Sequence, residues 1–258
     1  MNSRQNQSGQ IKSGRLVPLI VRVVGYFAIA VSVLAIFYGP RQITQRRAIA
    51  ELKKINAQAR TQPIALPFVA NVFGPEYSEE VIEAYLVSPE HTDAQLETVI
   101  GLTSLQKLEL SGSKITSDGL SKLSGLRNLY TLHLTNTLVD DSGLTSVSSL
   151  KNLGILSLTN TKVTDAGIAK LASMDKLERL SLDGTAITDV GLGTISQMTS
   201  LKELTLTRTK VTDVGAELLK SLKKLEILKI HETEVSIDKM KELSEALPDC
   251  AVLLSNAT

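Results

Sequence analysis

The residues best suited to metal binding or acid–base catalysis in this sequence are far apart along the chain: His91, His133, His231 and Cys250. His133 and His231 lie four periods apart in the 24-residue repeat described below. At about 4.8 Å per strand, they are separated by roughly 19 Å, too far to share a metal or to act as a catalytic pair. The sequence holds no phosphate-binding, zinc-binding or nucleophile motif. We therefore predict a protein that is not an enzyme and that has no metal or cofactor site.

A second set of candidates flanks the repeated leucines, at positions that face outward from a predicted sheet. These side chains combine cationic, anionic and imidazole groups, which suits contact with a protein or peptide partner. The same pattern is also typical of a solvated sheet face that binds nothing. The candidate partner contacts are Lys107, Glu109, His133, Arg179, Asp183, Glu203, Arg208 and His231.

The elements that must position these side chains are repeats with a period of 24 residues. One column of the repeat is leucine without exception: Leu108, Leu132, Leu156, Leu180, Leu204 and Leu228. A second apolar column follows two residues later, so each L-x-L pair places two side chains on one face of a short strand. Later L-x-x-L runs predict a helical turn. Because no single repeat can bury its apolar face, stacked repeats must share one core.

The repeats are predicted to extend over residues 78–246, with a degenerate repeat at the front. The apolar pattern continues into a C-terminal cap, residues 247–258, in which Leu247, Cys250 and Leu253 follow the pattern with a shift of one residue. Cys250 stands where the pattern requires leucine, which indicates a buried thiol. As the chain has one cysteine, no intramolecular disulfide can form.

Two polar columns accompany the apolar ones. The first is expected to pair backbone groups that the turns leave open: Ser113, Thr137, Thr161, Thr185, Thr209 and Thr233. The second is Thr-Asp-x-Gly, as in residues 164–167, where Thr or Asp can cap a helix and Gly indicates a constrained turn or a close approach of neighbouring coils. Calcium binding is the alternative for this column, but calcium-binding rolls have a nine-residue period.

The consensus L-x-x-L-x-x-L-x-L-x-x-T-x-[IV]-T-D-x-G-L-x-x-L resembles the leucine-rich repeat family. It looks most like the T-D-x-G-L subtype of ribonuclease-inhibitor-like arrays, F-box adaptors and short membrane-anchored bacterial proteins. The resemblance covers residues 78–258 and implies an α/β solenoid, with a parallel sheet on the concave face and short helices on the convex face. Since the family's common activity is protein binding, it implies a non-catalytic interaction module or scaffold. The alternative is a rigid spacer or structural envelope component without a specific ligand.

The charge of the chain is divided unevenly. Residues 1–62 carry ten Lys/Arg against a single acid, whereas the remainder has an excess of acidic residues. An acidic domain with few aromatic side chains is not suited to nucleic acid. The basic excess surrounds residues 16–38, an apolar run of 23 residues with one charge, Arg22. About 20 apolar residues cross a bilayer, so we predict a transmembrane helix here.

The segments around this helix complete the predicted domain organisation. A polar, basic N-terminus (1–15) precedes it and a basic juxtamembrane helix (39–60) follows, both placed to contact lipid headgroups. Residues 61–77 are predicted to be a linker and a lid over the first repeat. A cleaved signal peptide is disfavoured because no small-x-small site follows the apolar run.

The orientation of the predicted span is open. Positive charge after the span favours a cytoplasmic repeat domain. In contrast, a single N-terminal helix more often exports the domain that follows. We expect a single-pass protein with its repeats on the extracytoplasmic side.

Overall fold

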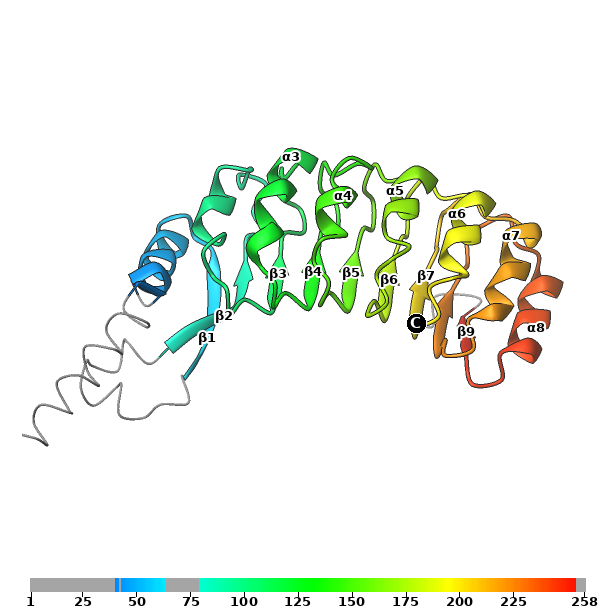
Figure 1. Cartoon of the computed structure of the whole chain (residues 1–258). Coiled ribbons are helices and arrows are strands. Elements are labelled where there is room, and N and C mark those ends of the chain that lie inside the picture. The colour runs from blue at the N-terminus through cyan, green and yellow to red at the C-terminus, as the bar shows by residue number, and fades with distance from the viewer. Residues whose placement is uncertain (1–39, 42, 64–78, 254–258) are drawn as a thin grey trace, which may run out of the picture. The chain divides into compact units, whose positions relative to one another are not determined.

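The computed structural model describes residues 40–41, 43–63 and 79–253. The chain divides into two units, Met1–Ile43 and Thr44–Thr258, and the strands and the helices α3 to α8 belong to the second. Within the described residues, nine strands form one sheet in chain order (Figure 1). β1 pairs antiparallel with β2, and every later pair is parallel. The strands are β1 Gln58–Pro63, β2 Glu79–Tyr85, β3 Lys107–Glu109, β4 Thr131–His133, β5 Ile155–Ser157, β6 Arg179–Ser181, β7 Glu203–Thr205, β8 Ile227–Lys229 and β9 Ala251–Leu253.

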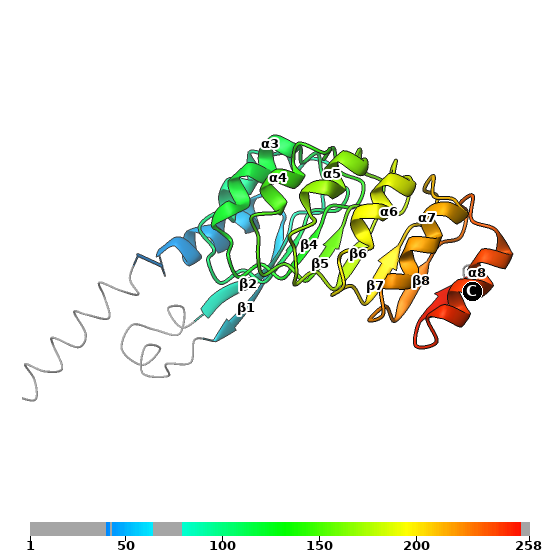
Figure 2. The ribbon, with the colours of Figure 1, turned by 45° about the vertical axis from the view of Figure 1, so that its right-hand side comes forward.

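Short helices return the chain from one strand to the next and lie along the side opposite the sheet (Figures 1 and 2). The α-helices are α3 Ser117–Leu120, α4 Leu144–Val147, α5 Asp165–Lys170, α6 Asp189–Ile195, α7 Asp213–Leu218 and α8 Ile237–Ala246. Single turns of 3-10 helix are η3 Gln95–Thr98, η4 Ser121–Gly125 and η5 Leu219–Ser221. The predicted architecture of a parallel sheet with short helices is therefore present.

The core lies between the sheet and the helices. The strand register places Leu108 beside Leu132, and the same 24-residue offset continues to β9. All six leucines of the column that contains Leu108, each in the middle of its strand, are buried. Burial of one leucine side chain contributes about 1.5–3 kcal/mol, so the shared core is the main source of stability.

The column of hydroxyl side chains has the structural role predicted for it. Each hydroxyl donates to the carbonyl three residues earlier, at oxygen–oxygen distances of 2.5 to 2.8 Å. In the array, Ser113, Thr137, Thr161, Thr185 and Thr209 are buried, so this bond satisfies a carbonyl that the turn removes from water.

The Thr-Asp-x-Gly motif caps a helix and also joins neighbouring repeats. The Thr188 hydroxyl accepts from the backbone N–H of Val190 at the start of α6, as expected for an N-cap. The aspartate of the preceding repeat, Asp165, accepts from both the N–H and the hydroxyl of Thr188, at 2.9 and 2.6 Å. The same paired contact recurs at residues 93–116, 141–164, 189–212 and 213–236.

The glycine of this motif makes room for that aspartate. A Cβ atom at Gly167 would lie 2.3 Å from Oδ1 of Asp141, and one at Gly191 would lie 2.4 Å from Oδ1 of Asp165. Neither glycine has a positive φ. Of the two roles predicted for the glycine, close approach of neighbouring repeats is therefore the correct one.

The N-terminal end differs from the prediction. The helix expected over 39–60 ends at residue 54, and residues 58–63 form β1 instead. The physical reason is that β2 would otherwise expose an unpaired edge, which β1 covers. The lid was assigned to residues 61–77, but residues 44–57 supply apolar cover, with Ala48 and Leu52 buried in the core. The apolar part of the expected lid, 64–73, lies outside the described residues.

Polar contacts fix this N-terminal cover to the first repeat. The Gln45 Oε1 atom accepts from the backbone N–H of Val81 at 2.9 Å. The Nδ1 atom of buried His91 accepts from the N–H of Ser88, so its Nε2–H donates to the Ile55 carbonyl at 3.0 Å. The residues just after the helix are thereby attached to the loop that follows β2.

The predicted transmembrane helix, residues 16–38, falls outside the part of the chain that the structure describes. No helix within the described part is both long and apolar enough to cross a membrane.

At the C-terminal end, Cys250 is buried as predicted, and burial raises the pKa of its thiol to about 11. The one-residue shift expected at this end does not extend to the strand. β9 pairs with β8 in the ordinary register, with Val252 beside Leu228, so the shift is confined to the residues before Ala251.

Candidate functional site

The outward side chains of the sheet form columns, because successive strand residues alternate between the core and the solvent. The strand register confirms two of the expected columns. One contains Glu83, Lys107, Thr131, Ile155, Arg179, Glu203 and Ile227. The other contains Tyr85, Glu109, His133, Ser157, Ser181, Thr205 and Lys229. Polar groups therefore dominate the sheet face, and they gather in three places.

The first group, called here the Tyr85 cluster, comprises Glu83, Tyr85, Lys107, Glu109 and His133 on β2, β3 and β4. The Tyr85 hydroxyl donates to Glu83, which also accepts from Arg60 on β1 at 3.0 Å. The Lys107 ammonium lies 5.1 Å from the centre of the Tyr85 ring, within range of a cation–π interaction. The Nδ1 atom of His133 lies 3.2 Å from a carboxylate oxygen of Glu109 on the adjacent strand.

The ionisation of this cluster follows from its contacts. The hydrogen bond from Tyr85 lowers the pKa of Glu83 and raises that of the tyrosine itself. Burial lowers the pKa of His133, although the nearby Glu109 carboxylate opposes this effect. Since an unperturbed histidine already titrates below neutral pH, His133 is neutral at pH 7 and presents a hydrogen-bonding imidazole.

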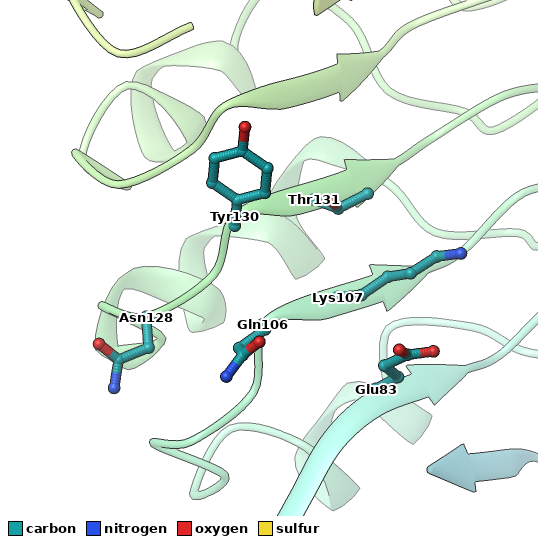
Figure 3. A pocket seen from close by; sticks show the side chains of 6 residues that line it. All are labelled: Glu83, Gln106, Lys107, Asn128, Tyr130 and Thr131. Carbon is teal, nitrogen blue, oxygen red and sulfur yellow. The ribbon is translucent and has the colours of Figure 1, made fainter. Parts of the chain in front are cut away.

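A hollow of about 370 Å³ opens beside the Tyr85 cluster, and Figure 3 shows the six side chains that line it: Glu83, Gln106, Lys107, Asn128, Tyr130 and Thr131. Tyr130 stands immediately before β4 and is 43% exposed. Its ring lies against the next repeat, where a Cβ atom at Gly154 would be 2.2 Å from the ring. Tyr130 also borders a second hollow of about 350 Å³, together with Glu178 and Lys202.

The second group is the pair of Arg179 on β6 and Glu203 on β7. The Nε atom of Arg179 lies 3.6 Å from a carboxylate oxygen of Glu203. The arginine side chain is 59% exposed, so the pair adds little stability and its groups remain accessible to a partner.

The third group lines a hollow of about 270 Å³ at the carboxyl ends of the strands, called here the Asp183 hollow. It is lined by Thr159, Asp183, Thr207, Arg208, Lys229, His231 and Glu232. One oxygen of Asp183 accepts from the Thr205 hydroxyl at 2.6 Å, and the other accepts from the Thr207 N–H at 2.7 Å. Both carboxylate oxygens are therefore used to hold the neighbouring repeat.

Two residues of this hollow have a left-handed backbone. One position in each repeat has a positive φ between 53° and 72°: Gly112, Asn136, Asn160, Gly184, Arg208 and Glu232. Glycine and asparagine tolerate this conformation, whereas for other residues it costs roughly 1–2 kcal/mol. Asn160 donates to the Asn136 side chain at 2.8 Å, and a Cβ atom at Gly184 would lie 2.1 Å from Asn160 Oδ1. Of these six positions, only those of Arg208 and Glu232 have the left-handed conformation with a residue that is neither glycine nor asparagine.

Comparison with known proteins identifies the repeats. Residues 175–235 match a family model described as leucine rich repeat, and residues 101–124 match a second model with the same description. The chain carries leucine-rich repeats. The assignment to the T-D-x-G-L subtype stays a prediction.

One solved structure with leucine-rich repeats supports this fold. An internalin C2 from Listeria monocytogenes is similar with a TM-score of 0.54 and 21% identity, over 78% of this chain and 93% of that chain. A second internalin from the same organism has a TM-score of 0.47 and 21% identity, over 62% of this chain and 56% of that chain. At such identities the likeness concerns the fold alone. No curated protein matches the sequence.

The eight residues predicted to contact a partner do not meet at one place on the leucine-rich repeats. They are distributed over the three groups described above. Lys107, Glu109 and His133 belong to the Tyr85 cluster, Arg179 and Glu203 form the second group, and Asp183, Arg208 and His231 line the Asp183 hollow. Their role in binding stays a prediction. Tyr130 was missed, although the sequence held a signal for it: a tyrosine is followed by glycine at the same position of the next repeat.

Replacement of Arg208 by glycine should stabilise the leucine-rich repeats by about 0.5–1 kcal/mol. Glycine adopts a positive φ without steric cost, and this gain exceeds the added entropy of the unfolded chain. Urea unfolding followed by circular dichroism would measure the change. Lys210→Gly is the matched control, because Lys210 has no positive φ and glycine should destabilise there by a similar amount. Loss of stability in Arg208→Gly would show that the arginine makes compensating contacts.

Proposed function

We propose that this chain is a non-catalytic module that binds another protein through the outward face of its leucine-rich repeat sheet. The observation that carries the proposal is the position of Tyr130, an exposed aromatic side chain between two hollows and beside the Tyr85 cluster. Aromatic side chains with pockets around them are the residues that most often dominate the affinity of protein interfaces.

The dimensions of the sheet face support a protein partner. Eight parallel strands at about 4.8 Å spacing give a face roughly 34 Å long, which accommodates an interface of standard size. Pockets for small molecules are usually lined by apolar side chains, but the residues that line the hollow beside the Tyr85 cluster and the Asp183 hollow are all of polar or charged types. Short polar side chains such as Thr131 and Ser157 between the charged groups leave the middle of the face without large obstacles.

Photo-crosslinking tests the proposal in the full-length chain. A photoreactive phenylalanine would be placed in native cells at Thr131 or Ile155 on the sheet face. The matched positions are Ala166 and Ser173 on the helical side, both exposed. We expect a discrete protein adduct from the sheet positions alone. Adducts from the helical positions alone, or from neither side, would contradict the proposal, and the latter result would favour a spacer.

Tyr130→Ala should reduce the yield of this adduct at least tenfold at limiting partner concentration, since truncation of such a residue commonly costs more than about 1.4 kcal/mol. Tyr130→Phe retains the ring and loses only the hydroxyl, which lies 3.5 Å from Glu178. We expect Tyr130→Phe to keep most of the yield. Equal yields from Tyr130→Ala and the natural chain would exclude Tyr130 as a main contact.

We also propose that residues 16–38 hold the module at a membrane, with the repeats on the extracytoplasmic side. The membrane anchor is supported by the length of the apolar run and by its basic flanks. The orientation is supported only by the tendency of a single N-terminal helix to export the domain that follows, against the positive charge after the span. The double substitution Val31→Asp, Val33→Asp should release the chain from carbonate-washed membranes, whereas Ser3→Asp, Ser8→Asp should not. Protease added to intact cells should cleave the repeats. Protection until lysis would place them in the cytoplasm.

A further inference from the structure

The Asp183 hollow contains cationic side chains that the fold does not use. Within the described residues, neither the Arg208 guanidinium nor the Lys229 ammonium makes a hydrogen bond or an ion pair. The Nδ1 atom of His231 is shielded from solvent and has no hydrogen-bond partner there. Such an atom loses its bonds to water without replacement, so a ligand that supplies a partner would be favoured.

The acidic residues of the hollow do not occupy these groups. Both oxygens of Asp183 already accept hydrogen bonds from Thr205 and Thr207. Glu232 is exposed at the rim and forms no ion pair with Arg208 in the described part of the chain. Arg208 is therefore available for an external anion.

The backbone at this position gives a reason to regard Arg208 as a binding residue. In four preceding repeats the equivalent left-handed position is glycine or asparagine, which adopt the conformation at low cost. Arg208 keeps it with φ of 56°, and within the described residues its side chain makes no hydrogen bond or ion pair that would offset the cost. Unfavourable backbone conformations of this kind cluster at binding sites, where the side chain is needed for something other than stability.

We infer that the Asp183 hollow binds the carboxylate of an acidic side chain on the partner protein, with Arg208 as the main contact. A planar guanidinium is matched to a carboxylate or a phosphate, each of which can accept two parallel hydrogen bonds. The lining holds two carboxylates, Asp183 and Glu232, beside the two cations Arg208 and Lys229, so a singly charged carboxylate is repelled less than a dianionic phosphate. A volume of about 270 Å³ admits one acidic side chain.

This inference names the partner chemistry of the proposed sheet-face interface and so rests on the proposed function. Small probes test it without the partner. The full-length chain, with 15N-labelled arginine and held in detergent micelles, would be titrated while the Arg208 Nε–H signal is followed by NMR. The probe is N-acetylglutamate N-methylamide, whose only carboxylate is in the side chain, and its neutral isostere is N-acetylglutamine N-methylamide.

We expect saturable binding of the glutamate probe with a dissociation constant of roughly 1–10 mM, in the range of weak single contacts. Binding of the glutamine probe should be at least tenfold weaker. In chains with 15N-labelled lysine, the Lys229 ammonium signal should show that Arg208→Gln weakens binding of the glutamate probe at least tenfold. Arg208→Lys, which retains the charge but loses the planar fork, should weaken it severalfold. Arg127→Gln is the matched control and should change nothing, because Arg127 is exposed and lies in the loop before β4, at the opposite ends of the strands from the hollow.

Three results would overturn the inference. Equal binding of both probes would show that the carboxylate is not recognised. Tighter binding of inorganic phosphate would assign the hollow to phosphate, and tighter binding of N-acetylglycine would assign it to a chain terminus. If the glutamate probe fails while crosslinks at Thr131 persist, the carboxylate site is wrong and the protein-binding proposal stands. If the probe binds but the sheet face gives no crosslinks, the hollow binds a carboxylate but the protein-binding proposal fails.

Discussion

Gly167→Ala is expected to destabilise the folded chain by about 1–3 kcal/mol, the usual cost of forcing an extra methyl group into a packed site. The new Cβ atom would lie 2.3 Å from Oδ1 of Asp141 and 3.0 Å from a methyl group of Leu144. Asp141 cannot move aside freely, because it holds the N–H and the hydroxyl of Thr164 at 2.7 and 2.6 Å. The alanine therefore either strains the backbone or breaks the contact between two repeats.

A double-mutant cycle separates these effects. Asp141→Ala alone should cost about 2–3 kcal/mol, since it leaves the Thr164 donors without a charged acceptor. In the double variant the methyl group finds space, so the combined loss should be about 1–3 kcal/mol smaller than the sum of the two single losses. Urea unfolding of all four chains gives the coupling, and additive losses would show that the glycine and the aspartate are independent.

Gly193→Ala is the matched control for this prediction. Gly193 lies within α6, and apart from its chain neighbours and the backbone of its own helix no atom lies within 4 Å of the Cβ position. Alanine there should stabilise the chain by about 0.5–1 kcal/mol through its higher helix propensity. Glycine-to-alanine substitution is thus expected to change the free energy of unfolding in opposite directions at two glycines of neighbouring helices.

The repeat period explains how much of the fold could be predicted. A strict 24-residue spacing determines which residues stack, so the strands, the buried leucines and the hydroxyl ladder followed from the sequence. The pairing of Asp165 with Thr188 was missed because the motif was considered within one repeat, whereas the contact joins two. Residues 58–60 were predicted to be helical and residues 61–63 to belong to a linker, but together they form β1. The strand was missed because these residues belong to no repeat, and only the edge of β2 that would otherwise stay unpaired explains why they form a strand.

The candidate site was predictable to a smaller extent. Sheet alternation gave the outward columns and so the eight charged or imidazole candidates. The importance of Tyr130 depends on the space above Gly154, and the availability of Arg208 depends on Asp183 being already bound by threonines. Both are consequences of three-dimensional contacts. The change from glycine or asparagine to Arg208 in the left-handed column, however, could have been found from the sequence.

Leu52→Asp is expected to lower the free energy of unfolding by at least about 4 kcal/mol, which is more than Gly167→Ala does. The substitution removes a buried leucine and places a charge at the end of the core. Leu52 is 1% exposed and lies in the same core cluster as Val81 of β2. End repeats of a solenoid have one face without a neighbour, so a cap is needed for their stability. The residues that supply this cap lie between the predicted transmembrane helix and the array.

Hydrogen exchange would show where the loss is concentrated. Because each repeat contacts only its neighbours, protection should fall most in β2 and β3 and least in β7 and β8. Lys53→Asp is the control, since Lys53 is exposed and adjacent in the same helix. If Leu52→Asp lowered protection uniformly along the array, the repeats would unfold as one cooperative unit. If both variants kept native protection, residues 44–57 would not be the cap, and β1 alone would have to protect the first repeat.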